Sequence, residues 1–292
     1  MVNAFGNSIK LAYRFLSLND MRVKELRLTE EDLDMKEKSE RNIERTYGLI
    51  RKSVPHGVQI DSLEVVKEVE KYRQFWKPDE INVILLAESH VYTDEQNYKI
   101  KCRRTFINKI IPNYPLHFVR FVYCLGYGEN GLLERKVKDN IMGTWQFWKI
   151  FSSCVAENEH NLGFEKVLKT KTPLLLRRLS NKVNILKKMK ERGIWLLDAS
   201  IIGLYRSGIK SYSTKKRVIE ICWENHLLNI INESQPKYII VIGKRVKNIL
   251  GSELKKTKIP FTTVSQPQAR GDSQEQLERY KKYQRICARY AQ

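Results

Sequence analysis

The sequence predicts an α/β fold, a three-layer αβα sandwich around a central, mostly parallel four-stranded sheet. Two observations lead to it. From residue 80 onward, short apolar runs alternate with longer amphipathic stretches of helical length. The runs are apolar at nearly every position, as expected for parallel strands that helices cover on both faces.

A helical extension, residues 1–77, is predicted to precede an α/β domain, residues 78–292. Within the extension, residues 22–52 have a helical pattern that is dense in charge. A second helix begins at Asp61, where the aspartate and the glutamate three residues later resemble a capping box. Apolar residues then recur at helical spacing until Pro78 ends the run.

The predicted elements of the α/β domain follow in order along the chain. Apolar runs predict strands at residues 81–86, 118–125, 194–197 and 238–242, with a shorter candidate at 261–264. Amphipathic stretches predict helices near residues 99–111, 143–156, 174–192, 215–233 and 273–289. The basic residues of the 174–192 helix are expected to form a solvated face. Because ligands of parallel sheets bind beyond the carboxyl ends of the strands, chemistry is expected in the residues that follow each strand.

Composition restricts the partners. The 292 residues carry a formal net charge of +20, which favours a polyanion such as DNA, although a Lys-rich coding composition gives the same number. No apolar run reaches the roughly 18 residues of a membrane span, and the first residues show no signal peptide. We therefore expect a cytoplasmic protein without a membrane partner. The five cysteines form no CxxC pair, so neither a metal nor another cofactor is expected.

The first strand is followed by the sequence Ala87–Tyr92. Its carboxylate, Glu88, can activate a water or stabilise a cation, or it can simply cap a helix. His90 is a candidate proton carrier or phosphate contact, although a lone histidine in a loop is more often neither.

Two further segments contain aromatic residues. The loop Gly126–Gly131 matches GxGxxG but does not open a helix, so we interpret it as a tight turn that presents Tyr127. The segment Gly143–Trp148 places three aromatics at the start of a helix, where they stack on bases or pack in the core.

Polar residues also follow the later strands. Asp198 ends the third predicted strand, where its carboxylate can accept hydrogen bonds from an amino group such as cytosine N4, or cap the next helix. A polar, basic loop bounded by Pro and Gly, residues 265–271, leaves the last strand and suits contact with DNA.

Three of these stretches resemble, in order, the motifs of the uracil-DNA glycosylase superfamily. They are Leu85–Val91 (LLAESHV), Trp195–Ser200 (WLLDAS) and Ser265–Arg270 (SQPQAR), and the resemblance covers about residues 80–290. In that superfamily a first strand runs into a GQDPY, GEAPG or GMNPG loop, an LLLN-type strand carries a base-reading Asn, and a late strand runs into an HPSP-type loop. The resemblance implies a monofunctional glycosylase that flips a base out of DNA and hydrolyses its N-glycosidic bond without a metal.

The resemblance implies roles by position. Glu88 falls where the GEAPG group has its Glu, which implies the catalytic carboxylate. Ser89 falls where the GQDPY group has its water-activating Asp, and it is expected near the base. Gln266 stands in place of the His that stabilises the departing base. Arg270 aligns with the residue that wedges into the duplex, and Ser265 beside Gln266 is expected to contact DNA.

Two departures from the family pattern bear on the substrate. Asp198 replaces the Asn that reads uracil, and a carboxylate repels uracil O4 but accepts well from a cytosine amino group. Val91 stands where the uracil-specific group has a Tyr that closes the C5 side, although a one-residue slip places Tyr92 there. Together they favour a C5-modified cytosine, such as the glucosylated hydroxymethylcytosine of phage DNA that some bacterial members attack in antiviral defence.

Three alternatives stay open. The first is a uracil-DNA repair glycosylase, the second a non-catalytic DNA- or base-binding module, and the third an unrelated nucleotide-binding protein that uses the Gly-rich loop. Basic residues that follow the predicted strands are candidate phosphate contacts, together with His90: Lys101, Arg103, Arg104, Arg206, Lys210, Lys215, Lys216, Arg217, Lys244, Arg245 and Lys247.

Overall fold

The computed structural model describes residues 30–140, 145–266 and 269–291, with the backbone alone for residues 30–36. The chain divides into two compact units, Met1–Asn42 and Ile43–Gln292. The described residues of the first unit are helical and belong to helix α2 (Glu30–Ser53). Residues 22–29, also predicted to be helical, lie outside the described residues.

The second unit contains one sheet of four strands, all parallel, which confirms the predicted fold class. The strands are β1 (Val83–Ala87), β2 (Ile194–Asp198), β3 (Tyr238–Ile242) and β4 (Phe261–Val264). Their order in the sheet is β2-β1-β3-β4, so the first strand of the chain is central. Nearly all strand residues are buried or half-buried, as expected of a sheet covered on both faces.

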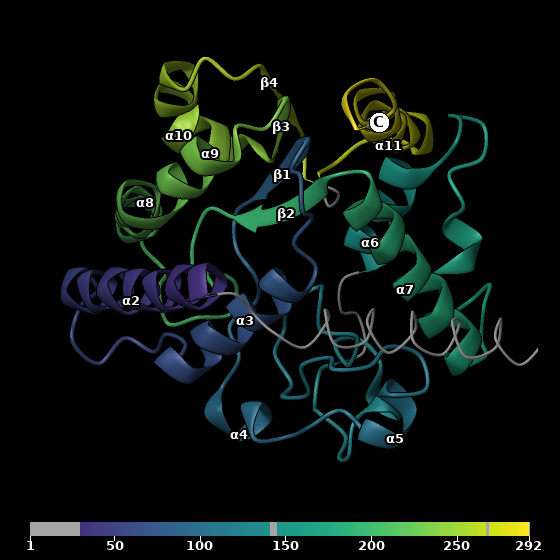
Figure 1. Cartoon of the computed structure of the whole chain (residues 1–292), viewed down its shortest axis with the longest axis horizontal. Helices are drawn as coiled ribbons and strands as arrows, with labels where there is room; N and C mark the ends of the chain where they lie inside the picture. Colours follow the sequence, from purple (N-terminus) through teal and green to yellow (C-terminus); the bar gives the residue numbers. More distant parts are fainter. Residues whose placement is uncertain (1–29, 141–144, 267–268, 292) are drawn as a thin grey trace, which may run out of the picture. The chain divides into compact units, whose positions relative to one another are not determined.

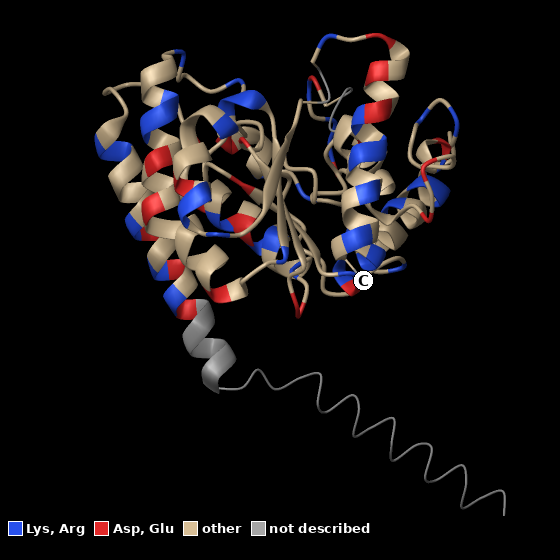
Figure 2. Cartoon of the chain, turned by 90° about the horizontal axis from the view of Figure 1, so that it is seen from above, with Lys and Arg blue, Asp and Glu red and all other residues tan. Residues whose placement is uncertain are grey.

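Helices cover both faces of the sheet (Figure 1). On one face lie α6 (Trp145–Val155), α7 (Leu175–Glu191) and α11 (Ser273–Tyr290). On the other lie α8 (Tyr212–Cys222), α9 (Leu228–Ser234) and α10 (Lys244–Lys256). The view from above shows the three layers with the sheet in the middle (Figure 2). The predicted 215–233 helix is divided, because a π-helical turn, η3 (Trp223–Leu227), separates α8 from α9.

The chain between β1 and α6 differs most from the prediction. Instead of a helix over 99–111 it contains two short helices, α4 (Glu95–Tyr98) and α5 (Arg104–Ile107). Residues 118–125, expected to form a strand, are irregular. The other short elements are the 3-10 helices η1 (Asn130–Leu132) and η2 (Phe164–Lys166).

The buried segment 118–125 avoids a strand because its backbone groups find partners elsewhere. The Arg120 N–H donates to the Thr93 hydroxyl at 2.8 Å, and the Leu125 N–H donates to the Tyr114 hydroxyl at 2.9 Å. Apolar side chains of the segment, such as Phe118, are fully buried. A continuous apolar run can therefore pack as irregular chain when each buried polar group is satisfied.

Helix α3 (Leu63–Phe75) belongs to the second unit, so the boundary predicted at residue 78 lies inside that unit. Its N-cap is Ser62, whose hydroxyl accepts from the N–H of Val65, and not the predicted Asp61. Asp61 is fully buried and has other partners in the site. Val65 and other apolar residues on one face of α3 are buried in the core of the second unit.

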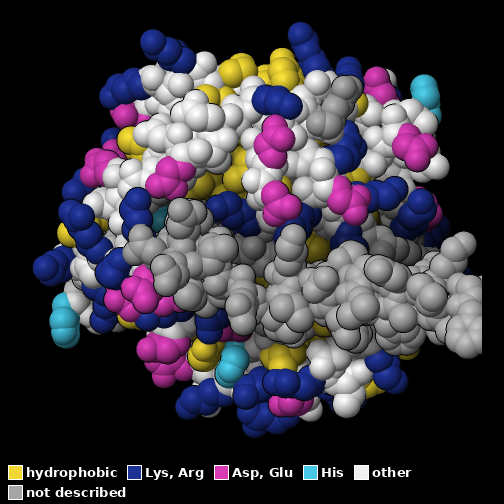
Figure 3. Space-filling model, viewed as in Figure 1, with side chains coloured by type: hydrophobic (Ala, Val, Ile, Leu, Met, Phe, Trp, Pro, Cys, Tyr) yellow, Lys and Arg dark blue, Asp and Glu magenta, His cyan; other side chains and the backbone are white. Residues whose placement is uncertain are grey.

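The basic helix α7 is not simply a solvated face. Arg178 and Lys182 are about 5% exposed, and both bind the buried carboxylate of Glu129, at 2.7 Å for the closest atoms of each pair. Two buried cations need such a partner, since an unpaired buried charge is costly. Elsewhere Lys and Arg side chains are spread over the viewed face among acidic residues (Figure 3). None of the described helices combines the length and apolarity needed to cross a bilayer.

Candidate functional site

A cavity of about 480 Å³ opens at the carboxyl ends of the strands. Its floor comes from residues that end or follow each strand: Ala87–Val91 after β1, Leu196 and Asp198 of β2, Ile242 of β3 and Gln266 after β4. The volume lies within the roughly 300–1,000 Å³ of small-molecule sites. The cavity therefore lies where a parallel sheet is expected to bind a ligand.

Glu88 lies on this floor, buried and bound by three side chains, two from loops and one from the first turn of α10. The Tyr205 hydroxyl donates to Oε2 at 2.7 Å, and Arg245 donates to Oε1 at 2.6 Å. The amide of Gln266 donates to Oε2 at 3.3 Å and to the Tyr205 oxygen at 2.7 Å. Since Glu88 is 3% exposed, these donors take the place of water around the carboxylate.

Local chain geometry brings Gln266 to this carboxylate. Gly243, at the start of α10, has φ +103° and lies against the Gln266 side chain. A Cβ at Gly243 would stand 2.7 Å from Cγ of Gln266. Glycine is therefore needed at this turn both for its backbone angle and for the space it leaves.

Asp198 lies on the same floor, 4% exposed. Its Oδ2 accepts from the guanidinium of Arg73 at 3.1 Å and lies 3.6 Å from Nδ1 of His90. Arg73 in turn binds Glu70 and lies over the ring of Phe121, 5.1 Å from its centroid. No hydrogen bond to the other oxygen, Oδ1 of Asp198, is found within the described residues, so that oxygen can accept from a ligand.

His90 lies between two carboxylates and has no exposed side-chain surface. Its Nε2 is 3.1 Å from Oδ2 of Asp61. That oxygen also accepts from the N–H of Gly203, while Oδ1 of Asp61 accepts from the N–H of Thr93. Burial by itself lowers the pKa of His90, but Asp198 and Asp61 raise it to about 9. The expected phosphate contact of His90 is therefore wrong, because the side chain is enclosed and both its nitrogens face carboxylates.

Aromatic side chains form the walls of the cavity. They come from Phe121, Tyr127, Trp145 and Phe147. Trp145 is 38% exposed, while Trp148, three residues on, is 1% exposed and belongs to the core. The aromatic segment thus contributes both to the cavity wall and to the core, although its first residues, 143 and 144, lie outside the described residues. Burial raises the pKa of Tyr127, which keeps its hydroxyl neutral.

Charged residues also line the cavity. They are Arg120, Asp139 and Arg206. Asp139 and Arg206 both have left-handed backbone angles, with φ of +59° and +61°. Non-glycine residues rarely adopt this conformation, and it often marks positions that a site constrains.

Other predicted residues are placed differently. Val91 lines the cavity and Tyr92 does not. Ser89 also lines it, but its hydroxyl donates to the backbone of His90 and accepts from the N–H of Leu204, which joins two loops. Its position is therefore explained by loop structure as well as by nearness to a ligand.

The predicted DNA contacts of the last loop lie outside the cavity lining. Lys244 and Arg270 are exposed, and Ser265 is half-buried. Residues 267 and 268 lie outside the described residues. Arg245, predicted to contact DNA, instead pairs with Glu88 while 40% of its side chain stays exposed.

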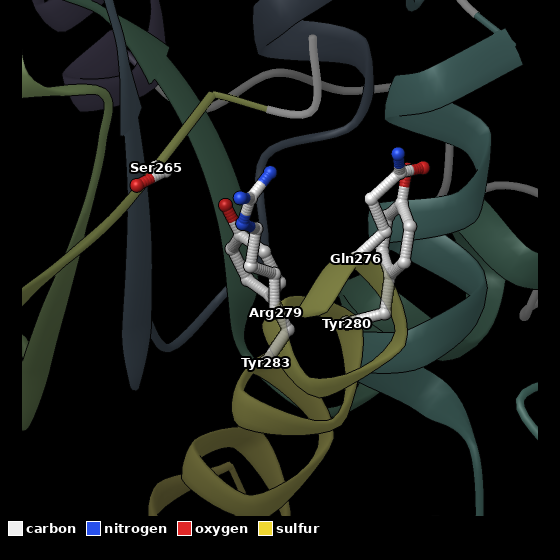
Figure 4. A pocket seen from close by; sticks show the side chains of 5 residues that line it. All are labelled: Ser265, Gln276, Arg279, Tyr280 and Tyr283. Atoms are coloured by element: carbon white, nitrogen blue, oxygen red, sulfur yellow. The ribbon is translucent and has the colours of Figure 1, made fainter. Parts of the chain in front are cut away.

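A second cavity, of about 10 Å³, lies between Ser265 and α11. Figure 4 shows its lining, with Gln276, Arg279, Tyr280 and Tyr283 on the helix and Ser265 on the facing segment just after β4. It has room for about one water. The guanidinium of Arg279 donates a hydrogen bond to the backbone oxygen of Ala269 at 2.7 Å.

Sequence reasoning missed several residues of the main site, among them Arg73, Asp61 and Tyr205. Arg73 lies in a helix assigned to the extension, and Asp61 looked like a helix cap. Tyr205 follows the Asp198 motif closely, and that proximity is a signal that could have identified it. For Arg73 and Asp61 no local signal existed, because their partners are 125 and 29 residues away.

The floor of the cavity presents two buried carboxylates, Glu88 and Asp198, below aromatic walls. Such an arrangement can stabilise a developing cation, activate a water and accept hydrogen bonds from a bound ring. No group of three or more metal-ligating side chains arranged to hold a metal occurs among the described residues. Family models, curated proteins and solved structures yield no match to this chain.

Proposed function

We propose that this protein is a DNA glycosylase that flips out a modified pyrimidine and hydrolyses its N-glycosidic bond. The substrate we favour is a C5-modified cytosine such as the glucosylated hydroxymethylcytosine of phage DNA, which would make the biological role antiviral defence. One observation carries the proposal: Glu88 and Asp198 lie on the floor of one aromatic-walled cavity at the ends of adjacent strands.

The surroundings of Glu88 support the role of catalytic carboxylate. Tyr205, Arg245 and Gln266 fix both of its oxygens. Cleavage of the bond between C1′ and the base nitrogen leaves its electron pair on the base and positive charge on the sugar. A fixed carboxylate stabilises that charge and accepts a proton from the water that attacks C1′. The base then takes up a proton as it leaves.

The surroundings of Asp198 support recognition of an amino group. A carboxylate only accepts hydrogen bonds, so its Oδ1 suits the N4 amino group of cytosine and opposes the O4 of uracil. Val91 on the cavity wall is smaller than tyrosine and leaves room for a C5 substituent. The aromatic walls suit stacking on a flipped base.

Base release from DNA tests the proposal. Duplexes that contain uracil, cytosine, hydroxymethylcytosine or glucosylated hydroxymethylcytosine are incubated with the protein, and free bases are identified by mass spectrometry. We expect release of a C5-modified cytosine and a loss of about 100-fold or more in the Glu88→Gln variant, because the carboxylate charge is removed.

A matched control is Glu191→Gln, which changes an exposed carboxylate at the end of α7 and should leave release unchanged. Release of uracil alone would keep the glycosylase and reject the cytosine-type substrate. Release equal in the wild type and Glu88→Gln would reject Glu88 as the catalytic carboxylate. Binding of DNA without release of any base would favour a non-catalytic module.

A further inference from the structure

A chain of buried charged groups runs behind the floor of the cavity. It passes from Glu70 to Arg73, to Asp198, to His90 and to Asp61, and each of these residues is at most 6% exposed. The five side chains come from α3, from the segment before it and from the ends of β1 and β2. Their contacts join three parts of the chain that are distant in sequence.

Among these five side chains, His90 is the one whose charge can change near neutral pH. When His90 is neutral, the other four side chains, three carboxylates and one guanidinium, carry a net charge of −2. When His90 is protonated, the net charge of the five is −1. Asp61 faces Nε2, Asp198 faces Nδ1, and the ring of Phe121 covers an edge at 6.2 Å between centroids.

The two nitrogens of His90 have different surroundings. Nε2 forms a hydrogen bond with Asp61, whereas Nδ1 has no hydrogen-bond partner in the described structure and lies 3.6 Å from Asp198. A proton on Nδ1 attracts the Asp198 carboxylate. A bare Nδ1 would place a lone pair against that carboxylate and repel it.

We propose that His90 is a positioning residue that, held as a cation by Asp61, fixes the position of the Asp198 carboxylate so that the cavity selects bases with an amino group. The selection of bases rests on the proposed function. The positive charge of His90, and its dependence on Asp61, are independent of that function.

The direction of the effect follows from hydrogen-bond chemistry. The Asp198 carboxylate presents acceptors, which pair with the N4 amino group of a cytosine-type base and oppose the O4 of uracil. Arg73 and His90 both lie against this carboxylate and hold it in place, so loss of either cation should weaken the preference for amino-bearing bases.

The first test reads the charge of His90 directly. Nitrogen NMR of ¹⁵N-histidine-labelled protein should show one imidazole, absent in His90→Gln, that is doubly protonated at neutral pH and loses its proton near pH 9. In Asp61→Asn, which keeps one acceptor oxygen and removes the negative charge, the midpoint should fall by about one pH unit or more. A neutral His90 in the wild type at pH 7, or an unchanged midpoint in Asp61→Asn, would overturn the proposal.

The second test measures discrimination. The ratio of hydroxymethylcytosine release to uracil release should fall by about tenfold or more in His90→Gln and in Asp61→Asn. Thermal melts establish that both variants are folded at the assay temperature. An unchanged ratio in the folded variants would overturn the positioning role. If the wild type releases no base, the proposed function fails, while the NMR titration still decides the claim about His90.

Discussion

Tyr205 is the residue that joins the parts of the candidate catalytic cluster. Its hydroxyl donates to Glu88 and accepts from Gln266, both at 2.7 Å. Burial and the neighbouring Glu88 raise the pKa of Tyr205, so the hydroxyl keeps its proton at neutral pH. It therefore orients the carboxylate as a neutral donor.

Tyr205→Phe removes this hydroxyl and keeps the ring. We expect kcat for base release to fall by up to about 100-fold with KM little changed, because the carboxylate loses a fixed orientation while the cavity keeps its shape. Steady-state kinetics on a labelled duplex measure both constants. A change confined to KM would show that Tyr205 serves binding instead.

The raised pKa of His90 predicts how stability depends on pH. Because its pKa is about 9 in the folded protein and 6.5 without the fold, the contribution is complete below pH 6.5 and is lost as pH rises through about 9. The size for this buried group is roughly 3 kcal/mol. Urea unfolding from pH 6 to 10 measures it, and Asp61→Asn should flatten the curve. A free energy of unfolding that rises over this interval would contradict the assignment.

At the scale of elements, the turn from β3 into α10 sets the position of two site residues. Arg245 lies in the first turn of α10, and Gln266 packs on Gly243 just before it. The site geometry therefore depends on a residue that contacts no ligand.

Gly243→Ala should destabilise the protein and impair base release together. The positive φ of +103° costs on the order of 1–3 kcal/mol for a residue with a Cβ, and the new methyl displaces Gln266. Gly251→Ala is the matched control on the same helix. Only Lys247 comes within 4 Å of its added Cβ, at 3.9 Å, so this variant should be more stable by about 0.5–1 kcal/mol. Urea unfolding and base release compare the two, and equal effects would contradict the role of the turn.

Helices and strands with a clear apolar periodicity were predictable from the sequence. Segments whose conformation depends on hydrogen bonds to distant residues were not. All four strands of the sheet and the long helices α7 and α11 follow from apolar pattern, since each buries a face along its length. Residues 118–125 have the composition of a strand, but hydroxyls from two other segments bind their backbone. A π-helical turn at Trp223–Leu227 likewise has no signature in the pattern.

The candidate site was predictable in part for the same reason. Glu88, Asp198 and Gln266 were found because they follow strands that the pattern identifies. Arg73 and Asp61 lie in or beside a helix that looked peripheral, and only the folded chain brings them to the sheet. The apparent boundary at residue 78 hid their connection to the site.

At the scale of the whole molecule, the net charge of +20 predicts salt-sensitive binding to DNA. Two phosphate contacts alone lower affinity by about tenfold between roughly 50 and 200 mM salt, and more contacts lower it further. Fluorescence anisotropy with an unmodified duplex measures the slope. Affinity that is independent of salt would contradict a phosphate-binding surface.

The order of partners along the chain has a consequence for synthesis. Glu88 is completed by Arg245 and Gln266, which are translated 157 and 178 residues after it. A nascent chain, or a product truncated before residue 245, carries the carboxylate without either partner. Premature termination or proteolytic loss of the last fifth of the protein therefore yields fragments that lack the assembled site, so any activity is a property of the finished chain.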